Sequence, residues 1–462
     1  MPLNRPLRIG LGIVGALVGL IAVAILSWNL WTIRALNLAK ARIAAAGLPT
    51  KISDFAKPPV AEAENAAPLI AEIKKITEGK DYDGTEPDTG VRSLLANFKE
   101  SHAPYKLDDA GIRDLTAILS RPSAREILTL IREAADRPAF DARLDLSLGP
   151  KLILEHLAPM RAGVDILRAH IRLASSTGSI DEAFTDLWRL LNLSDFMASE
   201  ASMMSHLISS SFLHAVIEEL AHAVANRAFS ERWARRFANR IKGIKLQLRL
   251  ITTLDVERVG FGAIIFEDML SGKIDAGEAL LGLASDVRQR PRASIYIPQG
   301  WVRMEYLTYL NCLQQYRALA ASHWARPAEQ QRRMRKLTEE ALSLRVFAPI
   351  ILPSLTSIVD RAMNLDLKIA AAVAGLEAYR YRLKHGEYPA SLSALVPEFL
   401  AVVPRDTFAG ADMLYVRKDA TFAIYSVGRN GTDDDGKFAP PEHDDLGFFP
   451  SLQTPTPAGA RR

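Results

Sequence analysis

The sequence contains one cysteine, Cys312, so no intrachain disulfide bond can form. This excludes a disulfide-stabilised scaffold, and a single cysteine in an apolar stretch is expected to be a small packed residue. The formal net charge of +4 over 462 residues is too small to indicate nucleic-acid binding. The sequence therefore predicts no nucleic-acid partner.

Motifs that carry common chemistry are also missing. The chain has no Gly-x-Ser-x-Gly nucleophile elbow and no phosphate-binding loop. Gly10, Gly12 and Gly15 lie inside an apolar run and do not follow a strand, which excludes a dinucleotide-binding turn. We therefore predict that the chain is not an enzyme.

One apolar run stands out near the N-terminus. Ile9 to Leu26 is 18 residues long without a charge, and Trp28 and Trp31 follow it. That length crosses a hydrocarbon core as a helix, and tryptophan suits the membrane interface. A cleaved signal peptide, which has a shorter apolar core, and a buried helix of a soluble protein are the alternatives. We predict a cytoplasmic stub and transmembrane anchor over residues 1–34.

The orientation of this anchor follows from the charges on its two sides. Arg5 and Arg8 precede the apolar run, and they compete with Arg34, Lys40 and Arg42 beyond it. We favour a cytoplasmic N-terminus. The prediction is a single-pass protein of the bacterial inner membrane, with the bulk of the chain extracytoplasmic.

Within a domain predicted over residues 35–350, the periodicity is helical almost everywhere from about residue 108 to residue 346, and residues 79–90 are expected to form a loop. Apolar residues recur at three- and four-residue steps at Ile153, Leu157, Met160, Val164, Leu167, Ile171 and Ala174. Gly178 interrupts this stripe, and we expect Asp181 to cap the next helix. The segment from Leu173 to Ala183 loosely resembles the inter-helix turn of tetratricopeptide-like helical hairpins, although the full consensus does not repeat. We predict an irregular helical-hairpin domain.

A different pattern begins near residue 350. A helical stripe from Ile358 to Leu383 ends at Gly386, and Pro389 prevents the helix from resuming. The segments 413–416 and 422–427 then alternate as two strands joined by a tight turn. This predicts a small α+β module over residues 351–449, with one long helix against an antiparallel hairpin sheet.

The order of short motifs in this module resembles the C-terminal domain of the type II secretion major pseudopilin, over about residues 357–447. These motifs are the Gly386-Glu-Tyr-Pro389 turn, the Pro404-Arg-Asp406 turn, the strand end Tyr425-Ser-Val-Gly428 and an aspartate-rich loop. The resemblance implies a pilin-like fold located outside the inner membrane. It also implies a calcium site in the loop, with Asp433, Asp435, Asp444 and Asp445 as ligands.

The chemistry of that loop suits calcium, because Ca²⁺ prefers six to eight oxygen ligands. A solvated acidic loop without metal is the alternative. The sequence also departs from the family: Asn430 replaces a usual aspartate, and residues 436–443 form a bulky insertion. No acidic residue lies between Arg8 and Ser27, where pseudopilins carry a glutamate. We therefore expect a fixed membrane protein that does not polymerise as a pilin.

A second candidate site lies in the helical domain. His214, Glu218 and His222 are four residues apart on one predicted helix, with His206 and Glu219 nearby. This stripe could face a groove and bind a metal, but histidines on amphipathic helices are more often structural. The expected function is a membrane-anchored scaffold that binds a protein partner at the cell envelope, related to secretion or surface assembly. The alternatives are an envelope enzyme, or a solute-binding or sensory ectodomain, using this helical groove.

The sequence specifies no substrate and no oligomeric state. Residues 450–462 are rich in proline and threonine and predict a disordered tail.

Overall fold

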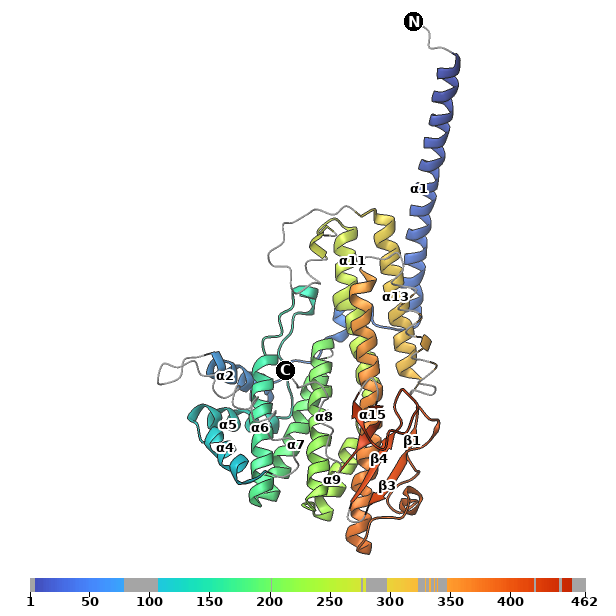
Figure 1. The fold of residues 1–462 in the computed structure, drawn as a ribbon. Coiled ribbons are helices and arrows are strands. Elements are labelled where there is room, and N and C mark those ends of the chain that lie inside the picture. The colour runs from blue at the N-terminus through green and yellow to red at the C-terminus, as the bar shows by residue number, and fades with distance from the viewer. Residues whose placement is uncertain are drawn as a thin grey trace.

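The computed structural model describes residues 5–78, 107–200, 202–275, 277–279, 297–322, 347–418, 421–439 and 443–450, with a few single positions between 329 and 339. The fold is mainly helical, with a long apolar helix at the N-terminus and small antiparallel strands at the C-terminus (Figure 1). The fold class predicted from the sequence is thereby confirmed. The predicted disordered tail lies outside the described residues from position 451 onward.

The first helix, α1 (Arg5–Ala45), runs without interruption through the apolar segment and beyond it. It ends at Ala45, and Gly47, two residues later, has a φ of 68°, which favours glycine. Its first half projects away from the body (Figure 1), and the side chains from Ile13 to Leu26 are exposed there. Its second half buries Leu36 and Ile43 beside α13 (Gln299–Ala321).

By length and composition, α1 is the one helix in the described residues that could cross a membrane. Such a helix near the N-terminus is either a membrane anchor or a signal sequence.

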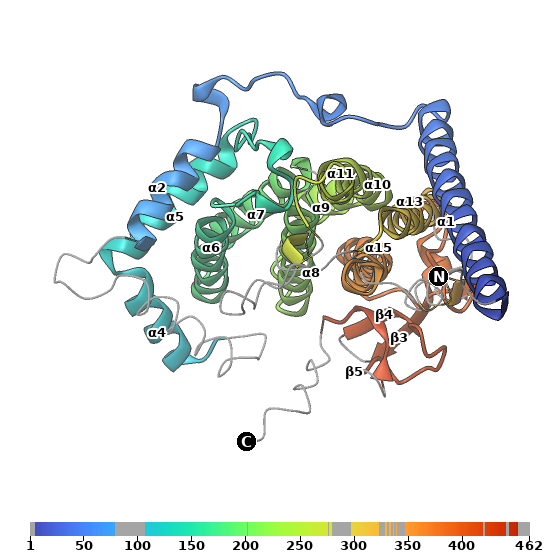
Figure 2. The same cartoon turned by 90° about the horizontal axis from the view of Figure 1, so that it is seen from above.

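A stack of helices follows α1 and a short connection. The helices are α2 (Ala67–Glu78), α4 (Asp109–Leu119), α5 (Pro122–Asp136), α6 (Leu157–Thr177), α7 (Ile180–Ser199), α8 (Met203–Ala225) and α9 (Glu231–Lys242). Seen from above, they form an arc that runs from α4 and α5 to α8 and α9 (Figure 2). Gly178 ends α6 in the left-handed conformation, with φ of 88°.

The helix α7 begins two residues earlier than the sequence suggested, with Ser179 at the N-cap position. Its first residue is Ile180, so Asp181 lies inside the first turn and does not cap the helix. The carboxylate of Asp181 instead accepts a hydrogen bond from the indole Nε1 of Trp233 on α9, at 2.8 Å. The Asp181 carboxylate therefore makes a tertiary contact with α9 and does not cap its own helix.

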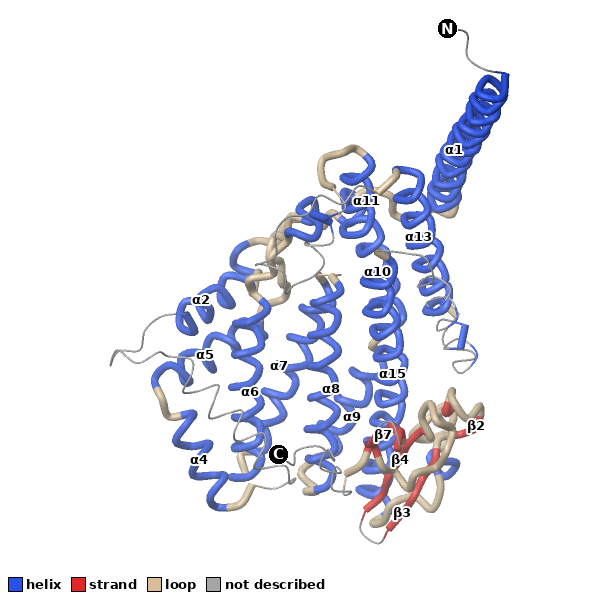
Figure 3. Tube along the Cα trace, turned by 45° about the horizontal axis from the view of Figure 1, so that its top comes forward, coloured by secondary structure: helices blue, strands red, loops and turns tan. Residues whose placement is uncertain are grey.

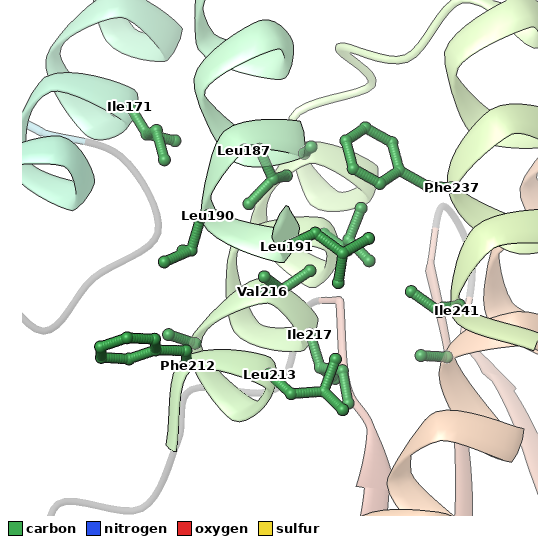
Figure 4. Close-up of a cluster of buried hydrophobic side chains, with 14 of the residues drawn as sticks. Ile171, Leu187, Leu190, Leu191, Phe212, Leu213, Val216, Ile217, Phe237 and Ile241 are labelled. Atoms are coloured by element: carbon green, nitrogen blue, oxygen red, sulfur yellow. The ribbon is translucent and has the colours of Figure 1, made fainter. Parts of the chain in front are cut away.

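The core of this stack is apolar and closely packed (Figure 4). It is formed where α6, α7, α8 and α9 meet, and it includes Ile171, Leu187, Leu190, Leu191, Phe212, Leu213, Val216, Ile217, Phe237 and Ile241. Each of these side chains is buried. Burial of such apolar area is the main stabilising contribution to the stack.

A second apolar cluster lies closer to the anchor. It joins α1 and α13 with α10 (Leu246–Val256), α11 (Ala263–Leu270) and the first half of α15 (Ala348–His385). A π-helical segment, η4 (Glu257–Gly262), links α10 to α11. A Cβ atom at Gly262 would lie 2.1 Å from the ring of Tyr309, so only glycine permits this packing.

The C-terminal strands pack on the second half of α15. The largest sheet has the antiparallel order β3 (Leu414–Lys418), β4 (Thr421–Ser426) and β7 (Leu446–Phe448). Short pairs are formed by β1 (Arg405–Asp406) with β2 (Ala411–Asp412), and by β5 (Phe438–Ala439) with β6 (His443–Asp444). The predicted hairpin and the helix end at Gly386, with φ of 86°, are confirmed.

The helix α15 packs against both the strands and the helical stack. One continuous core contains Leu376 and Tyr379 of α15, Ile424 of β4 and Phe237 of α9. The domain boundary predicted at residue 350 falls near the start of α15. Residues of this helix share one core with the helices before the boundary and with the strands after it. The strands are therefore fixed to the helical body by a shared core.

Candidate functional site

The aspartate-rich loop is organised by a buried carboxylate that precedes it in the sequence. Asp406 is 1% exposed. Its Oδ1 accepts hydrogen bonds from Phe408 N (2.8 Å) and from Ser426 Oγ (2.8 Å), and its Oδ2 accepts one from Val427 N (2.9 Å). Ala409 N also donates to Oδ1, at 3.2 Å. Asp406 thus connects its own turn to the end of β4, where the loop begins.

Gly428 brings the two ends of the loop into contact. Its φ is 63°, and a Cβ atom at this position would lie 1.9 Å from the carbonyl oxygen of Asp444. The next residue, Arg429, donates its backbone N–H to Asp444 Oδ2 at 2.8 Å. A side chain at position 428 would separate the two segments.

Asp445 has an unusual environment, because its side chain is fully buried. Its Oδ2 accepts hydrogen bonds from the backbone N–H groups of Asp434 (2.9 Å) and Gly436 (2.8 Å). Its Oδ1 is buried without a hydrogen-bond partner. Burial raises the pKa of Asp445 to about 6, although the two backbone hydrogen bonds oppose that rise.

The charges of three of the four predicted ligands act on one tyrosine hydroxyl. Tyr425 donates a hydrogen bond to Asp433 Oδ1 at 3.0 Å. Burial raises the pKa of Tyr425 well above its usual value, and Asp433, Asp445 and Asp435 raise it further through their charges. Negative charge is therefore concentrated at this end of β4.

The fourth predicted ligand, Asp444, faces different partners. Its Oδ2 is 3.8 Å from Nε of Arg429 and accepts that residue's backbone N–H. Burial lowers the pKa of Lys368 on α15, and the charges of Glu218 and Asp444 oppose this effect. The charges of Asp433, Asp435 and Asp445 thus all act on Tyr425, whereas the charge of Asp444 acts on Lys368 of α15.

In the described part of the chain, no group of three or more histidine, cysteine or acidic side chains is arranged to hold a metal ion. The loop carboxylates instead accept backbone N–H groups, as Asp433 does from Asp435 N at 3.0 Å. One feature still suits a cation: the orphaned, buried Oδ1 of Asp445. The donor set is all oxygen, which is the set that Ca²⁺ selects.

The second candidate site, on α8, forms an ion-pair network with α6. Arg168 Nη2 lies 3.1 Å from Glu218 Oε2, and Arg172 Nε lies 3.0 Å from Glu219 Oε1. His214 Nε2 lies 3.3 Å from Glu218 Oε1. Burial opposes ionisation of Glu218, but the hydrogen bond from His214 and the nearby charges outweigh it and lower the pKa to about 2.

This protonation state limits the chemistry of the network. A carboxyl group with a pKa of about 2 is ionised at neutral pH and is a poor general acid or base. Burial lowers the pKa of His206 to about 4, and this residue lies apart from the network, beside Thr253 of α10 at 3.4 Å. The five predicted residues therefore do not form one constellation, and the enzyme alternative stays a prediction.

Sequence reasoning assigned no role to Asp406 and did not name Asp434 as a site residue. Asp434 accepts hydrogen bonds from Asn430 Nδ2 (2.8 Å) and from Asp444 N (3.1 Å). The Pro-x-Asp turn was a local signal for Asp406, since aspartate accepts N–H groups two and three residues ahead. No local signal identifies the contact between Asp434 and Asp444, because the two residues are ten positions apart in the sequence.

No family model matches the chain, and no curated protein or solved structure matches it.

Proposed function

We propose that the chain is a membrane-anchored scaffold of the bacterial cell envelope, with a type II secretion pseudopilin-like module at its end. The observation that carries this proposal is the continuity of α1. One uninterrupted helix contains the exposed apolar segment and then packs on α13. A body held in this way stays beside the bilayer, and a signal sequence would not need such packing.

The location proposed for the body is outside the inner membrane, with a single crossing and a cytoplasmic N-terminus. Arg5 and Arg8 support this orientation through the positive-inside rule. The resemblance of residues 357–447 to a pseudopilin module supports it independently.

Calcium is the proposed ligand of the aspartate-rich loop. Asp433, Asp435 and Asp445 would hold the ion, with Asp445 contributing its unpartnered oxygen. The proposal also includes Asp444 as a ligand through small movements of the loop. The role of the ion would be structural, because binding to the folded loop alone stabilises the folded state.

The partner proposed for the scaffold is a protein of the secretion or surface-fibre machinery. The strands and the arc of helices present separate surfaces on one rigid body (Figure 3). Such a body can hold two partners at a fixed spacing.

Site-specific labelling tests the orientation. The labelling variant carries two substitutions. Serine replaces the native cysteine Cys312, which is 4% exposed, and cysteine replaces the exposed Asp412 as the labelling site. A membrane-impermeant maleimide is expected to label this variant in intact spheroplasts. The matched control carries Asn4→Cys and is expected to react only after lysis. Labelling with the reverse pattern would contradict the proposed topology.

Crosslinking tests the scaffold role. The tagged chain is crosslinked in intact cells, and the covalent products are identified by mass spectrometry. We expect secretion or fibre subunits joined to the module, and fewer of them when Asp445→Asn removes a proposed calcium ligand from the loop. Recovery of the chain alone, at a level of expression that labels efficiently, would refute the scaffold proposal.

A further inference from the structure

A cavity lies beneath the connection between α1 and α2. This connection, residues 46–66, is here called the strap; it crosses the convex side of the arc and contains η1 (Ile52–Phe55) and η2 (Glu62–Glu64) (Figure 2). It is held by side chains of the body. Arg258 Nη2 donates to Pro49 O at 2.8 Å, and Lys57 Nζ donates to Ser199 O.

The cavity has a volume of about 400 Å³, within the range of small-molecule sites. Strap residues 54–57 form one wall, and the end of α7 and one face of α10 form the others. Phe55, Leu146, Leu248 and Val256 supply apolar surface. Leu248 is 61% exposed, so an apolar ligand group covering it would remove that surface from water.

A buried carboxylate with a free acceptor lines this cavity. The side chain of Glu200 is 4% exposed. Its Oε2 accepts hydrogen bonds from His156 Nε2 (2.8 Å) and Ser205 Oγ (2.5 Å). Its Oε1 is buried and has no partner. An acceptor of this kind normally has a donor in the functional state, because leaving it unpaired is costly.

Two cations line the same cavity. Arg249 binds Asp195 through Nη2 and lies 3.5 Å from Ser209 Oγ through Nη1, and its guanidinium has five N–H donors in all. Lys57 is on the strap. The cavity thus combines an anionic acceptor, cationic donors and an apolar wall. This combination suits a ligand that carries a positive group, a negative group and an apolar group.

We propose that this cavity binds a free α-amino acid with an apolar side chain. The ammonium group donates to the Glu200 carboxylate, whose Oε1 is solvent-inaccessible in this structure and turns toward the cavity on binding. The ligand carboxylate accepts from Arg249 and Lys57, and the ligand side chain covers Leu248 and Val256. The site is separate from the aspartate-rich loop and from the α6–α8 network. It does not depend on the proposed scaffold role.

Calorimetric titration of the full-length protein in detergent tests the proposal. The probes are L-leucine, L-valine, L-isoleucine, L-methionine and L-phenylalanine. We expect at least one to bind with a Kd of about 1 mM or tighter. The matched probes for the best ligand are its N-acetyl and its amide derivatives, which lack one charge each. Each is expected to bind roughly ten-fold more weakly or worse.

Two variants and a control locate the binding site. Glu200→Gln keeps the shape of the side chain and is expected to weaken binding by roughly ten-fold or more. Thr252→Trp adds bulk at an exposed rim position and is expected to block the cavity without disturbing the core. Glu155→Gln removes an exposed carboxylate elsewhere, paired with Lys74 at 2.7 Å, and is expected to bind as the wild type does.

The proposal is overturned if none of the five amino acids binds more tightly than about 10 mM. It is also overturned if Thr252→Trp binds the ligand as the wild type does. This second variant decides the matter should Glu200→Gln fail to fold. Equal affinity for the N-acetyl derivative would likewise exclude the ammonium contact with Glu200.

Discussion

Gly375 of α15 and Phe448 of β7 are in direct contact: a Cβ atom at Gly375 would lie 2.3 Å from Cδ1 of the phenylalanine ring. Phe448 is 1% exposed and belongs to the core shared by the strands and the helical stack. The absence of a side chain at position 375 is therefore what lets the sheet lie against the helix.

The substitution Gly375→Val is expected to destabilise the protein by about 1–3 kcal/mol, because the added methyl groups overpack a core that cannot expand. Urea unfolding of the full-length protein measures the change. Arg361→Val, at an exposed position of the same helix, is the control for placing a β-branched residue in a helix. Equal effects of the two substitutions would mean that the ring of Phe448 moves aside freely.

Removal of the carboxylate of Asp406 is expected to destabilise the strands. Asp406→Ala leaves the hydroxyl of Ser426 and the backbone N–H of Val427 without their acceptor. The expected cost is about 2–4 kcal/mol in unfolding free energy. Asp412→Ala, at an exposed position of β2, should change stability by less than about 0.5 kcal/mol. Comparable melting of both variants would show that Asp406 is dispensable.

The buried carboxyl group of Glu257 predicts a dependence of stability on pH. Burial raises its pKa to about 7 from 4.5 in the unfolded chain. The folded state thus binds the proton more tightly, and its contribution to stability is complete below pH 4.5 and is lost as the pH rises through about 7. The loss amounts to about 3 kcal/mol.

The variant Glu257→Gln carries no titrating group at that position, so it isolates this effect. It is expected to match the wild type in urea unfolding at about pH 4 and to exceed it in stability at about pH 8. Glu133→Gln, whose parent side chain is 50% exposed, is the matched control and should show no such difference. If the difference in unfolding free energy between Glu257→Gln and the wild type were the same at the two pH values, the raised pKa of Glu257 would be contradicted.

Calcium is expected to raise the melting temperature of the full-length protein. At about 100 times its Kd, the ion would stabilise the folded state by about 2.7 kcal/mol. Asp445→Asn and Asp435→Asn should abolish the increase, while Asp412→Asn, outside the loop, should retain it. Without calcium, Asp445→Asn should be at least as stable as the wild type, because it removes a buried charge. Identical melting in calcium and in chelator would rule out the site.

Local chemistry made part of this fold predictable. The end of α15 at Gly386 and the β3–β4 hairpin have short-range signals, and the structure confirms them. Asp181 was misassigned as a cap because Trp233, 52 residues later, takes its carboxylate. Such long-range partners have no periodicity to reveal them.

The sites were less predictable than the elements, for the same reason. The aspartates of the loop were evident as a cluster in the sequence. Which of them act on Tyr425 and which on Lys368 depends on the close approach of Gly428 to Asp444, which the sequence does not show. The cavity beside Glu200 arises from the strap, α7 and α10, which lie far apart in the sequence. The π-helical segment η4 has no sequence pattern that distinguishes it from an ordinary helix.

The unbroken course of α1 has a mechanical consequence. From Leu26 to Ala45 the helix continues for 19 residues, or about 29 Å at 1.5 Å per residue, with no hinge between them. If the apolar half sits in lipid, any tilt of that rod turns the whole arc and its strands by the same angle. The body would then be held at a fixed distance from the membrane and at a fixed angle to it, and it would encounter its partners by lateral diffusion in the bilayer.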